Sequence, residues 1–141
     1  KETLLVINCD ILTGVDFRAM LLYHRELKAD LTVAVTQYEL QVPYGVIECE
    51  GPLVRRIVEK PRYDFFVGAG IYLVEPAAYP LIPKNQRFDM TDLIEGLVQN
   101  GRRVASFPVR EYWLDIGQHE DYERAQERAR NWSRSAKKAT L

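Results

Sequence analysis

The sequence predicts an α/β domain with a mostly parallel sheet and an inserted antiparallel section at residues 44–74. Three features lead to this prediction. Residues 4–8 form a continuous apolar run, which is typical of a strand buried on both faces of a sheet. Apolar side chains then recur at helical spacing over residues 15–29. A β-branched segment at residues 31–38 follows, and this order predicts a βαβ unit with a parallel, right-handed crossover.

Size and composition exclude several classes of protein. At 141 residues the chain has the length of one domain, and 47% hydrophobic and 28% charged residues are typical of a globular protein. A net charge of -1 gives no electrostatic reason to expect nucleic acid or an anionic membrane as a partner. No apolar run is long enough for a membrane span, and no signal peptide is visible. Cys9 and Cys49 lack a CxxC spacing, which favours reduced thiols in a cytoplasmic protein.

Capping signals define two helices. Thr13 is expected to cap the first helix, and Asp89 to cap a second helix over residues 90–100 that ends at Gly101. The expected inward-facing side chains of this second helix are Leu93, Ile94, Leu97 and Val98.

Shorter segments complete the predicted fold. Strands are expected at residues 44–49, 53–59 and 65–74, and a tight turn at residues 50–51 joins the first two. A short helix beginning at Pro76, a strand at 103–109, a final helix at 119–132 and a polar tail at 133–141 follow. Because the chain opens directly into a strand without an initiator Met, we expect it to be the later part of a longer polypeptide, with residues 1–132 as one portion of a domain.

Two carboxylates stand where strands are expected to end. Asp10 follows the apolar run at residues 4–8, and Asp115 lies in the apolar segment at residues 111–117. Ligands of open α/β sheets bind beyond the carboxyl ends of strands, and a carboxylate in an apolar setting requires a partner. Asp10 and Asp115 are therefore predicted to converge on one divalent cation. The alternatives are a turn residue for Asp10 and a capping or strand-end acid for Asp115.

An acid and a base precede a proline at the end of another predicted strand. Lys60 suits a phosphate, and Glu59 suits sugar hydroxyl groups. Pro61 is expected to hold Lys60 in an extended conformation. The alternative is a solvated surface ion pair. Together with the two carboxylates, the motif indicates a phosphate-handling site that uses a divalent metal.

Glycines and histidines add weaker signals. Gly68 and Gly70 inside a strand pattern indicate a bulge or the close approach of a ligand. Residues 43–46 form a turn into a strand. His24 is expected to be a packed core histidine, and His119 is given no role.

In this order the motifs resemble the sugar-1-phosphate nucleotidyltransferases, or nucleoside-diphosphate-sugar pyrophosphorylases, and most of all the mannose-1-phosphate guanylyltransferase-like branch. The resemblance extends over residues 4–128 and implies a Rossmann-like nucleotide-diphospho-sugar transferase fold that is incomplete at the N-terminus. The motifs that carry it lie at residues 8–13, 42–46, 59–61, 69–72, 88–93 and 113–117.

The resemblance implies an activity and a set of site residues. The family joins a sugar 1-phosphate to a nucleoside triphosphate and releases pyrophosphate, so that positioning and charge neutralisation dominate catalysis. It implies a cytoplasmic enzyme of nucleotide-sugar and polysaccharide biosynthesis, with a homo-oligomer formed through exposed sheet edges as a further expectation. The implied catalytic residues are Asp10, Lys60 and Asp115, with Mg²⁺ held by Asp10 and Asp115. The implied substrate-binding residues are Tyr44, Gly45, Glu59, Lys60, Gly70 and Tyr72.

The sequence departs from the family pattern in three places. Cys9 stands where the family usually has glycine, and Gly68 where it often has asparagine. The glycine-rich nucleotide-binding loop is absent, and the family places it in a segment that would precede Lys1. The chain is therefore expected to supply the sugar side and the metal carboxylates and to be inactive alone. Three alternatives stay open: a non-catalytic sugar-phosphate or nucleotide-sugar binding or regulatory module, a glycosyltransferase of related architecture, and a structural fragment without activity.

Overall fold

The computed structural model describes residues 2–117, 121–123 and 125–126. The chain divides into two compact units, Lys1–Val35 with Gly68–Leu141, and Thr36–Val67. In chain order the elements are β1 (Leu4–Ile7), β2 (Ile11–Thr13), α1 (Phe17–Glu26), β3 (Leu31–Gln41), β4 (Val46–Glu50), β5 (Leu53–Val58), β6 (Arg62–Val74), the 3₁₀ helix η1 (Tyr79–Leu81), α2 (Met90–Gln99), β7 (Val104–Pro108) and β8 (Trp113–Asp115).

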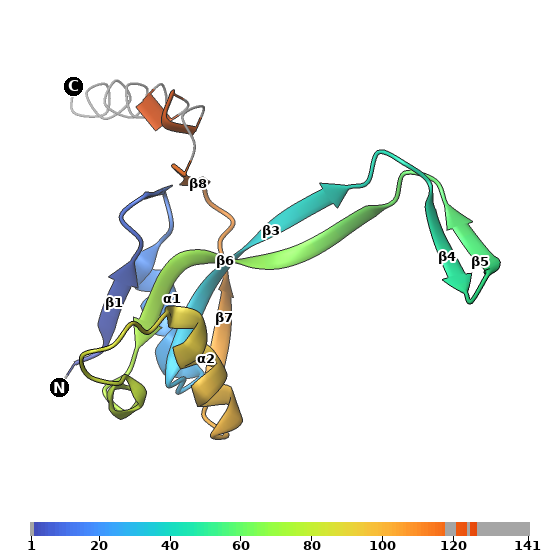
Figure 1. The fold of residues 1–141 in the computed structure, drawn as a ribbon. Coiled ribbons are helices and arrows are strands. Elements are labelled where there is room, and N and C mark those ends of the chain that lie inside the picture. Colours follow the sequence, from blue (N-terminus) through green and yellow to red (C-terminus); the bar gives the residue numbers. More distant parts are fainter. Residues whose placement is uncertain (1, 118–120, 124, 127–141) are drawn as a thin grey trace, which may run out of the picture. The chain divides into compact units, whose positions relative to one another are not determined.

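A four-stranded sheet in the order β1-β6-β3-β7 forms the centre of the first unit (Figure 1). Strands β3 and β7 are parallel, and β1 is antiparallel to β6. The α/β class is as predicted, but two details of the βαβ expectation are wrong. Strands β1 and β3 are not neighbours, because β6 lies between them. Nor is β1 buried on both faces: it lies at the edge of the described sheet, and Leu4, Leu5 and Ile7 are 43–50% exposed.

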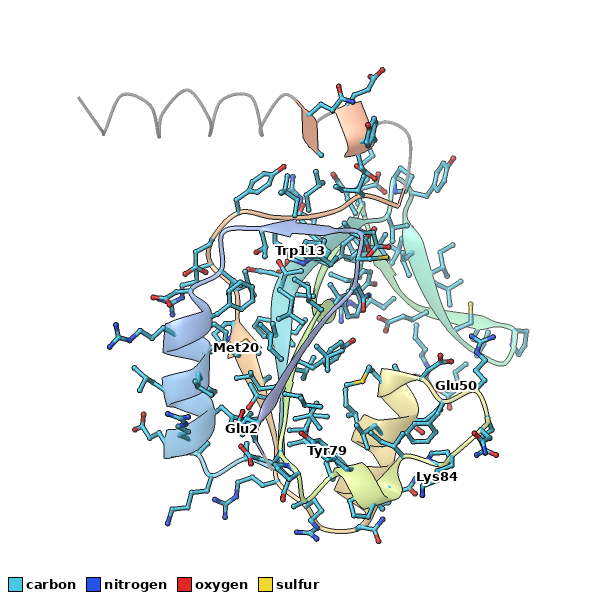
Figure 2. The ribbon with its side chains drawn as sticks, turned by 90° about the vertical axis from the view of Figure 1, so that its left-hand side faces the viewer. Glu2, Met20, Glu50, Tyr79, Lys84 and Trp113 are labelled. Carbon is cyan, nitrogen blue, oxygen red and sulfur yellow. The ribbon has the colours of Figure 1, made fainter. Side chains whose placement is uncertain are left out.

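The two helices cover opposite faces of this sheet (Figure 2). Side chains alternate between the faces of a strand, so neighbouring residues of β6 join different cores. Ile71 and Leu73 pack in the cluster that contains Met20 of α1. Val74 packs in the other cluster, with Leu97 of α2. The second half of β6, from Ala69 to Val74, is therefore covered on both sides, as its apolar sequence requires.

Helix α1 begins at Phe17 and is capped by Asp16, so the prediction that Thr13 caps it is wrong. Asp16 Oδ1 accepts hydrogen bonds from the backbone N–H groups of Arg18 (2.9 Å) and Ala19 (3.0 Å). Thr13 instead ends β2, a strand of three residues that was not predicted. So short a strand has no alternation pattern to detect, and its pairing with β8 is a long-range contact.

Asp16→Ala should lower the free energy of unfolding by about 1 kcal/mol, because two N–H groups of the first turn lose their acceptor. Urea unfolding followed by circular dichroism measures the change. Asp16→Asn is the matched control, since asparagine caps helices about as well as aspartate. An equal loss in both variants would show that the cap contributes nothing.

Helix α2 agrees with its predicted start and end. Asp89 is the N-cap and takes part in a capping box, and Gly101 follows the C-cap with a φ of +67°. Leu93 and Leu97 are buried as expected. Val98 is 59% exposed, so its predicted inward orientation is wrong. The buried stripe of α2 is narrower than its apolar sequence indicates.

The remaining helical predictions are met in part. The short helix expected from Pro76 is the 3₁₀ helix η1, which begins only at Tyr79 after a turn at residues 76–78. The final helix predicted at residues 119–132 lies largely outside the described residues, as do His119 and the tail at 133–141. Among the residues that the structure describes, no helix is long and apolar enough to span a membrane.

The second unit contains the predicted hairpin. Strands β4 and β5 are antiparallel, with Val46 opposite Val58, and the turn between them includes Gly51 at a φ of +56°. The register shifts between Glu48 and Cys49. None of residues 36–67 is buried, so hydrogen bonds and partly covered side chains hold this unit together.

A buried polar chain links α1, β3 and the end of β6, and it confirms His24 as a core histidine. The His24 ring is 1% exposed; its Nδ1 lies 2.7 Å from Thr32 Oγ1, and its Nε2–H donates to Glu75 Oε1 at 3.0 Å. The Thr3 hydroxyl also donates to Glu75 Oε1, at 2.6 Å. This hydrogen bond, supported by His24 and Arg25 and opposed by burial, holds the pKa of the Glu75 carboxyl below its usual value.

Glu75→Gln should make the free energy of unfolding less dependent on pH in the acid range. A carboxyl whose pKa is lowered by folding stabilises the folded state above its unfolded pKa, roughly 4.3, and this contribution disappears as the pH falls through the folded pKa. Unfolding free energies from neutral to acid pH should therefore drop more steeply in the wild type than in the variant. The exposed Glu95→Gln serves as a control. If the Glu75→Gln and wild-type curves run in parallel, the polar chain does not stabilise the fold in this way.

Candidate functional site

A short ladder between β2 and β8 brings the backbone segments of the two predicted metal-binding residues together. Ile11 on β2 is the partner of Asp115 on β8. The ladder continues one step further, because the Ile116 N–H donates to the Asp10 carbonyl at 2.8 Å. Asp10 and Asp115 are thus placed at adjoining positions of two paired segments that lie far apart in the sequence.

The Asp10 carboxylate has the character of a cation ligand. Its Oδ1 is buried, and within the described part of the chain it is the one buried side-chain oxygen or nitrogen atom without a hydrogen-bond partner. Burial of an unpaired carboxylate oxygen is costly, so such an atom indicates that a positive ligand belongs beside it.

The second carboxylate is open to solvent and to ligands. Asp115 is exposed, and a Cβ at Gly117 would lie 3.3 Å from its Oδ1, so glycine leaves the carboxylate room. No group of three or more His, Cys, Asp or Glu side chains gathers at a metal-binding distance among the described residues. Two carboxylates nevertheless fit Mg²⁺, which proteins often bind through one or two carboxylates with water and substrate phosphates as the other ligands.

Two residues outside the predicted set hold this arrangement in place. The Asn8 N–H donates to the Gly70 carbonyl at 2.9 Å, and Gly70 has a φ of +69°. A Cβ at Gly70 would lie 2.9 Å from Asn8 Nδ2, so the glycine is required both for backbone conformation and for space. The Trp113 indole N–H donates to the Ala69 carbonyl at 2.8 Å and ties β8 to β6. Asn8 lies in the motif at residues 8–13 and Trp113 in the motif at residues 113–117. Membership of these motifs is the sequence signal that could have indicated both residues.

Tyr72 takes part in the packing of the central sheet. On β6 it is paired with Val6 of β1, and its side chain packs against the apolar cluster that contains Leu97 of α2. Burial raises the pKa of its hydroxyl group. Its predicted contact with substrate therefore stays a prediction.

In the second unit, Glu59 lies directly over the backbone of Gly45. A Cβ at Gly45 would meet Glu59 Oε2 at 3.1 Å and Ile57 Cδ1 at 3.3 Å. The φ of Gly45 is not positive, so the glycine here provides space and not an unusual backbone conformation. The neighbouring Tyr44 is 74% exposed. A carboxylate beside a bare backbone can accept hydrogen bonds from hydroxyl groups that approach over the glycine.

Lys60 has a left-handed backbone conformation with a φ of +44°, so the expectation that Pro61 keeps it extended is wrong. Two backbone hydrogen bonds hold the turn: the Lys60 N–H donates to the Tyr44 carbonyl at 3.3 Å, and the Val42 N–H donates to the Pro61 carbonyl at 3.0 Å. A non-glycine residue in this region is strained, and such residues concentrate at functional sites. Because the backbone bends at Lys60, Glu59 and Lys60 do not follow the side-chain alternation of one straight strand.

The structure thus brings the predicted residues together in two groups, each within its own unit. The first unit holds Asp10 and Asp115, with Gly70 bonded to Asn8 in the segment that leads to Asp10. The second unit holds four more in and around one turn, namely Tyr44, Gly45, Glu59 and Lys60. Tyr72, in the first unit, belongs to neither group.

Comparison with known proteins gives this arrangement its context. A family model described as nucleotidyl transferase matches residues 1–131. The chain belongs to the nucleotidyl transferase family. Among curated members, mannose-1-phosphate guanyltransferase beta-A of Xenopus laevis is 28% identical over 126 residues, and mannose-1-phosphate guanyltransferase of Debaryomyces hansenii is 31% identical over 124 residues. These alignments cover 86% and 83% of this chain but 35% and 33% of the relatives, so the chain spans about a third of their length.

A solved structure shows that the nucleotidyl transferase fold extends to this chain. A candidate glucose-1-phosphate thymidylyltransferase of Bacillus anthracis, crystallised with sucrose, superposes with a TM-score of 0.64 at 22% identity. The superposition covers 91% of this chain and 55% of that protein. The predicted nucleotide-diphospho-sugar transferase fold, present in part, is therefore confirmed.

Proposed function

We propose that this chain is the sugar-side and metal-side portion of an enzyme that joins a sugar 1-phosphate to a nucleoside triphosphate and releases pyrophosphate. The observation that carries the proposal is the buried, unpartnered Oδ1 of Asp10, in a segment whose backbone is bonded to that of Asp115 and Ile116, in a chain of the nucleotidyl transferase family. The relatives named as mannose-1-phosphate guanyltransferases support mannose 1-phosphate and GTP as the first substrates to test. A cytoplasmic location and a role in nucleotide-sugar and polysaccharide synthesis belong to the same proposal.

Each site residue has a role that follows from its chemistry. Mg²⁺ bound by Asp10 and Asp115 would neutralise phosphate charge and fix the phosphate oxygens for in-line attack. Lys60 places a positive charge at the phosphate of the sugar substrate. Glu59 accepts hydrogen bonds from sugar hydroxyls, and Gly45 leaves room for the sugar beside that carboxylate. These groups bind and orient, which is most of what phosphoryl transfer asks of a protein.

The isolated chain is proposed to bind a sugar 1-phosphate without turning it over. It spans about a third of its curated relatives, and the family's nucleotide-binding loop is absent from its sequence. Without groups that hold the triphosphate, the α-phosphorus is not presented to the attacking oxygen, and the advantage of proximity is lost.

The test has two parts. Calorimetric titration of the purified chain with mannose 1-phosphate should show binding that requires Mg²⁺, and a pyrophosphate-release assay with added GTP should show no turnover. Glu59→Gln should weaken binding, while Glu48→Gln on the hairpin should leave it unchanged. Absence of Mg²⁺-dependent binding to a panel of hexose 1-phosphates would contradict the assigned site. Clear release of pyrophosphate would contradict the inactivity of the isolated chain.

A second candidate function is a non-catalytic module that binds a sugar phosphate or a nucleotide sugar. The exposed Cys9 next to Asp10, where the family usually has glycine, favours it. Cys9→Gly separates the two functions: in an enzyme it should relieve crowding beside Asp10 and strengthen Mg²⁺-dependent binding of mannose 1-phosphate, whereas in a binding module it should leave that binding unchanged.

A further inference from the structure

Two consecutive carbonyl groups of β6 hold the two segments that carry the candidate metal-binding carboxylates. The Gly70 carbonyl accepts a hydrogen bond from the Asn8 N–H at 2.9 Å. The Ala69 carbonyl accepts one from the Trp113 indole N–H at 2.8 Å. Each of these donors stands two residues before one of the carboxylates. The neighbouring peptide groups of residues 69 and 70 therefore define where both segments meet the central sheet.

Strand β8 requires such an attachment, because it does not belong to the central sheet. It pairs with β2 in a separate two-stranded sheet, in a ladder that begins at Ile11 and Asp115. A two-stranded ribbon is marginally stable by itself. The ladder fixes β8 relative to β2, and the indole hydrogen bond of Trp113 fixes β8 relative to β6.

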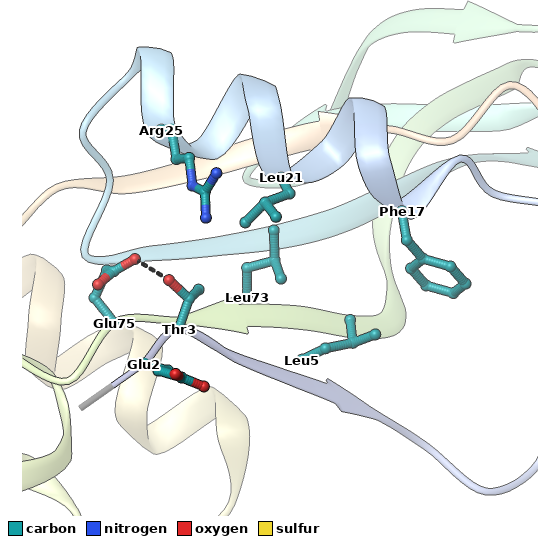
Figure 3. A pocket seen from close by; sticks show the side chains of 8 residues that line it. All are labelled: Glu2, Thr3, Leu5, Phe17, Leu21, Arg25, Leu73 and Glu75. Carbon is teal, nitrogen blue, oxygen red and sulfur yellow. Dashed lines mark hydrogen bonds between the residues drawn. The ribbon is translucent and has the colours of Figure 1, made fainter.

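The apolar core holds the indole in this position. Trp113 is partly buried and packs against the cluster that contains Ala69 and Met20. In the same cluster, Leu21 of α1 and Leu73 of β6 point toward one another (Figure 3). Ala69 is 0% exposed, so water cannot replace the indole N–H as a donor to its carbonyl. The hydrogen bond is therefore protected from competition with solvent.

Gly70 supports the other segment on both sides of Asp10. A Cβ at Gly70 would meet Asn8 Nδ2 at 2.9 Å and Ile11 Cγ1 at 3.2 Å. Asn8 and Ile11 thus both lie against the Gly70 backbone, and Asp10 lies in the short turn between them. Ile11 is in turn the ladder partner of Asp115. Both carboxylate-bearing segments are consequently fixed against one short stretch of β6.

We propose that Trp113 is a positioning residue of the metal site, which fixes Asp115 relative to Asp10 through the Ala69 carbonyl. Side chains two residues apart lie on the same face of a strand, so Asp115 shares its face of β8 with the indole. Ligands from segments far apart in the sequence bind a metal tightly only when their relative position is fixed beforehand, because otherwise binding must itself order them. The inference rests on the proposed metal role of the two carboxylates.

Trp113→Phe tests the proposal, because phenylalanine keeps an aromatic ring and lacks the N–H donor. Mn²⁺ takes the same oxygen ligands as Mg²⁺, and its titration into the chain with mannose 1-phosphate, followed by electron paramagnetic resonance, measures the affinity of the metal site. We expect the variant to bind Mn²⁺ roughly 10- to 100-fold more weakly, the usual effect of removing a group that orients a metal ligand.

The outcomes separate the positioning role from the metal site. Unchanged Mn²⁺ affinity in Trp113→Phe, beside a wild type that binds Mn²⁺, would overturn the positioning role alone. A wild type that binds no Mn²⁺ would overturn the metal site and the positioning role with it.

Phe107→Leu is the matched control for packing. Phe107 packs against the same apolar cluster as Trp113, but its ring has no hydrogen-bond donor. This variant should lower the free energy of unfolding, because it removes part of an aromatic side chain from the core, and it should leave the Mn²⁺ affinity unchanged. Equal losses of Mn²⁺ affinity in both variants would show that general loosening of the core is responsible and would overturn the proposal.

A third chain keeps the test decisive if Trp113→Phe fails to fold. Benzothienylalanine has the shape of tryptophan with a sulfur atom in place of the N–H group, and stop-codon suppression places it at residue 113 alone. This chain should fold and should lose Mn²⁺ affinity as Trp113→Phe does. Wild-type Mn²⁺ affinity in this chain would show that the indole N–H has no positioning role.

Discussion

Gly70→Ala is expected to destabilise the protein by about 2–4 kcal/mol. Gly70 has a φ of +69°, where a residue with a Cβ loses roughly 1–2 kcal/mol of stability. The added Cβ would also lie 2.9 Å from Asn8 Nδ2, so the segment that leads to Asp10 must move. Urea unfolding gives the loss, and weaker Mg²⁺-dependent binding of mannose 1-phosphate should accompany it.

Gly68→Ala provides the matched control within the same strand. The nearest atom to a Cβ at Gly68 is Val33 Cγ2 at 4.0 Å, and Gly68 does not have a positive φ. The free energy of unfolding should therefore change by less than about 1 kcal/mol. Equal losses at both positions would mean that the close contact between Gly70 and Asn8 is not what constrains the loop.

Asp10→Asn and Asp115→Asn should each weaken Mg²⁺-dependent binding of mannose 1-phosphate by at least roughly 100-fold. Loss of residues that merely support a metal ligand already costs roughly 10- to 100-fold in metal sites, and these two residues are the proposed ligands themselves. Asp10→Asn carries a second expectation, because its Oδ1 is buried without a donor. In the absence of metal this variant should be at least as stable as the wild type, since a buried unpaired charge is removed.

Measuring both substrate binding and stability distinguishes a metal ligand from a structural residue. A structural carboxylate would lose stability on substitution and binding only as a consequence, whereas a metal ligand loses binding and keeps stability. Asp64→Asn, an exposed carboxylate of the second unit, is the control and should change neither quantity. Loss of stability in Asp10→Asn without metal would therefore argue against the assigned role.

Periodicity predicted the elements whose signal is local. The apolar stripe of residues 17–27 and the capping signals around Asp89 depend on neighbours within a few residues, and both helices occur. The start of α1 was misplaced because two capping residues compete there. Pairing of β2 with β8 places Thr13 in a strand and leaves Asp16 as the cap, and this pairing joins residues as far apart in the sequence as Thr13 and Trp113.

The burial of β1 could not be read from its sequence. Its continuous apolar run is typical of an interior strand, yet β1 is an edge strand in the described sheet. An apolar run indicates that a strand suits a buried position, but whether the strand is buried depends on which other segments pack against it. The exposed Leu4, Leu5 and Ile7 are the visible result of this difference.

At the candidate site, residue chemistry was predictable and geometry was not. Asp10 and Asp115 could be selected because each follows an apolar segment, but their meeting depends on two three-residue strands that carry no pattern. Lys60 was assigned an extended conformation from the proline that follows it. Hydrogen bonds at Lys60 and Pro61 impose a left-handed turn there instead, and a rule about adjacent residues cannot anticipate bonds to residues far along the chain.

The most direct test of the paired-carboxylate site is a titration of the wild-type chain with Mn²⁺, followed by electron paramagnetic resonance. Mn²⁺ shares the oxygen ligands of Mg²⁺ and can be counted while bound. The site predicts one bound ion per chain that Mg²⁺ displaces, that mannose 1-phosphate tightens, and that both Asp10→Asn and Asp115→Asn abolish. A wild-type chain that binds no Mn²⁺ in the presence of mannose 1-phosphate, or one whose bound ion survives both substitutions, would contradict the account.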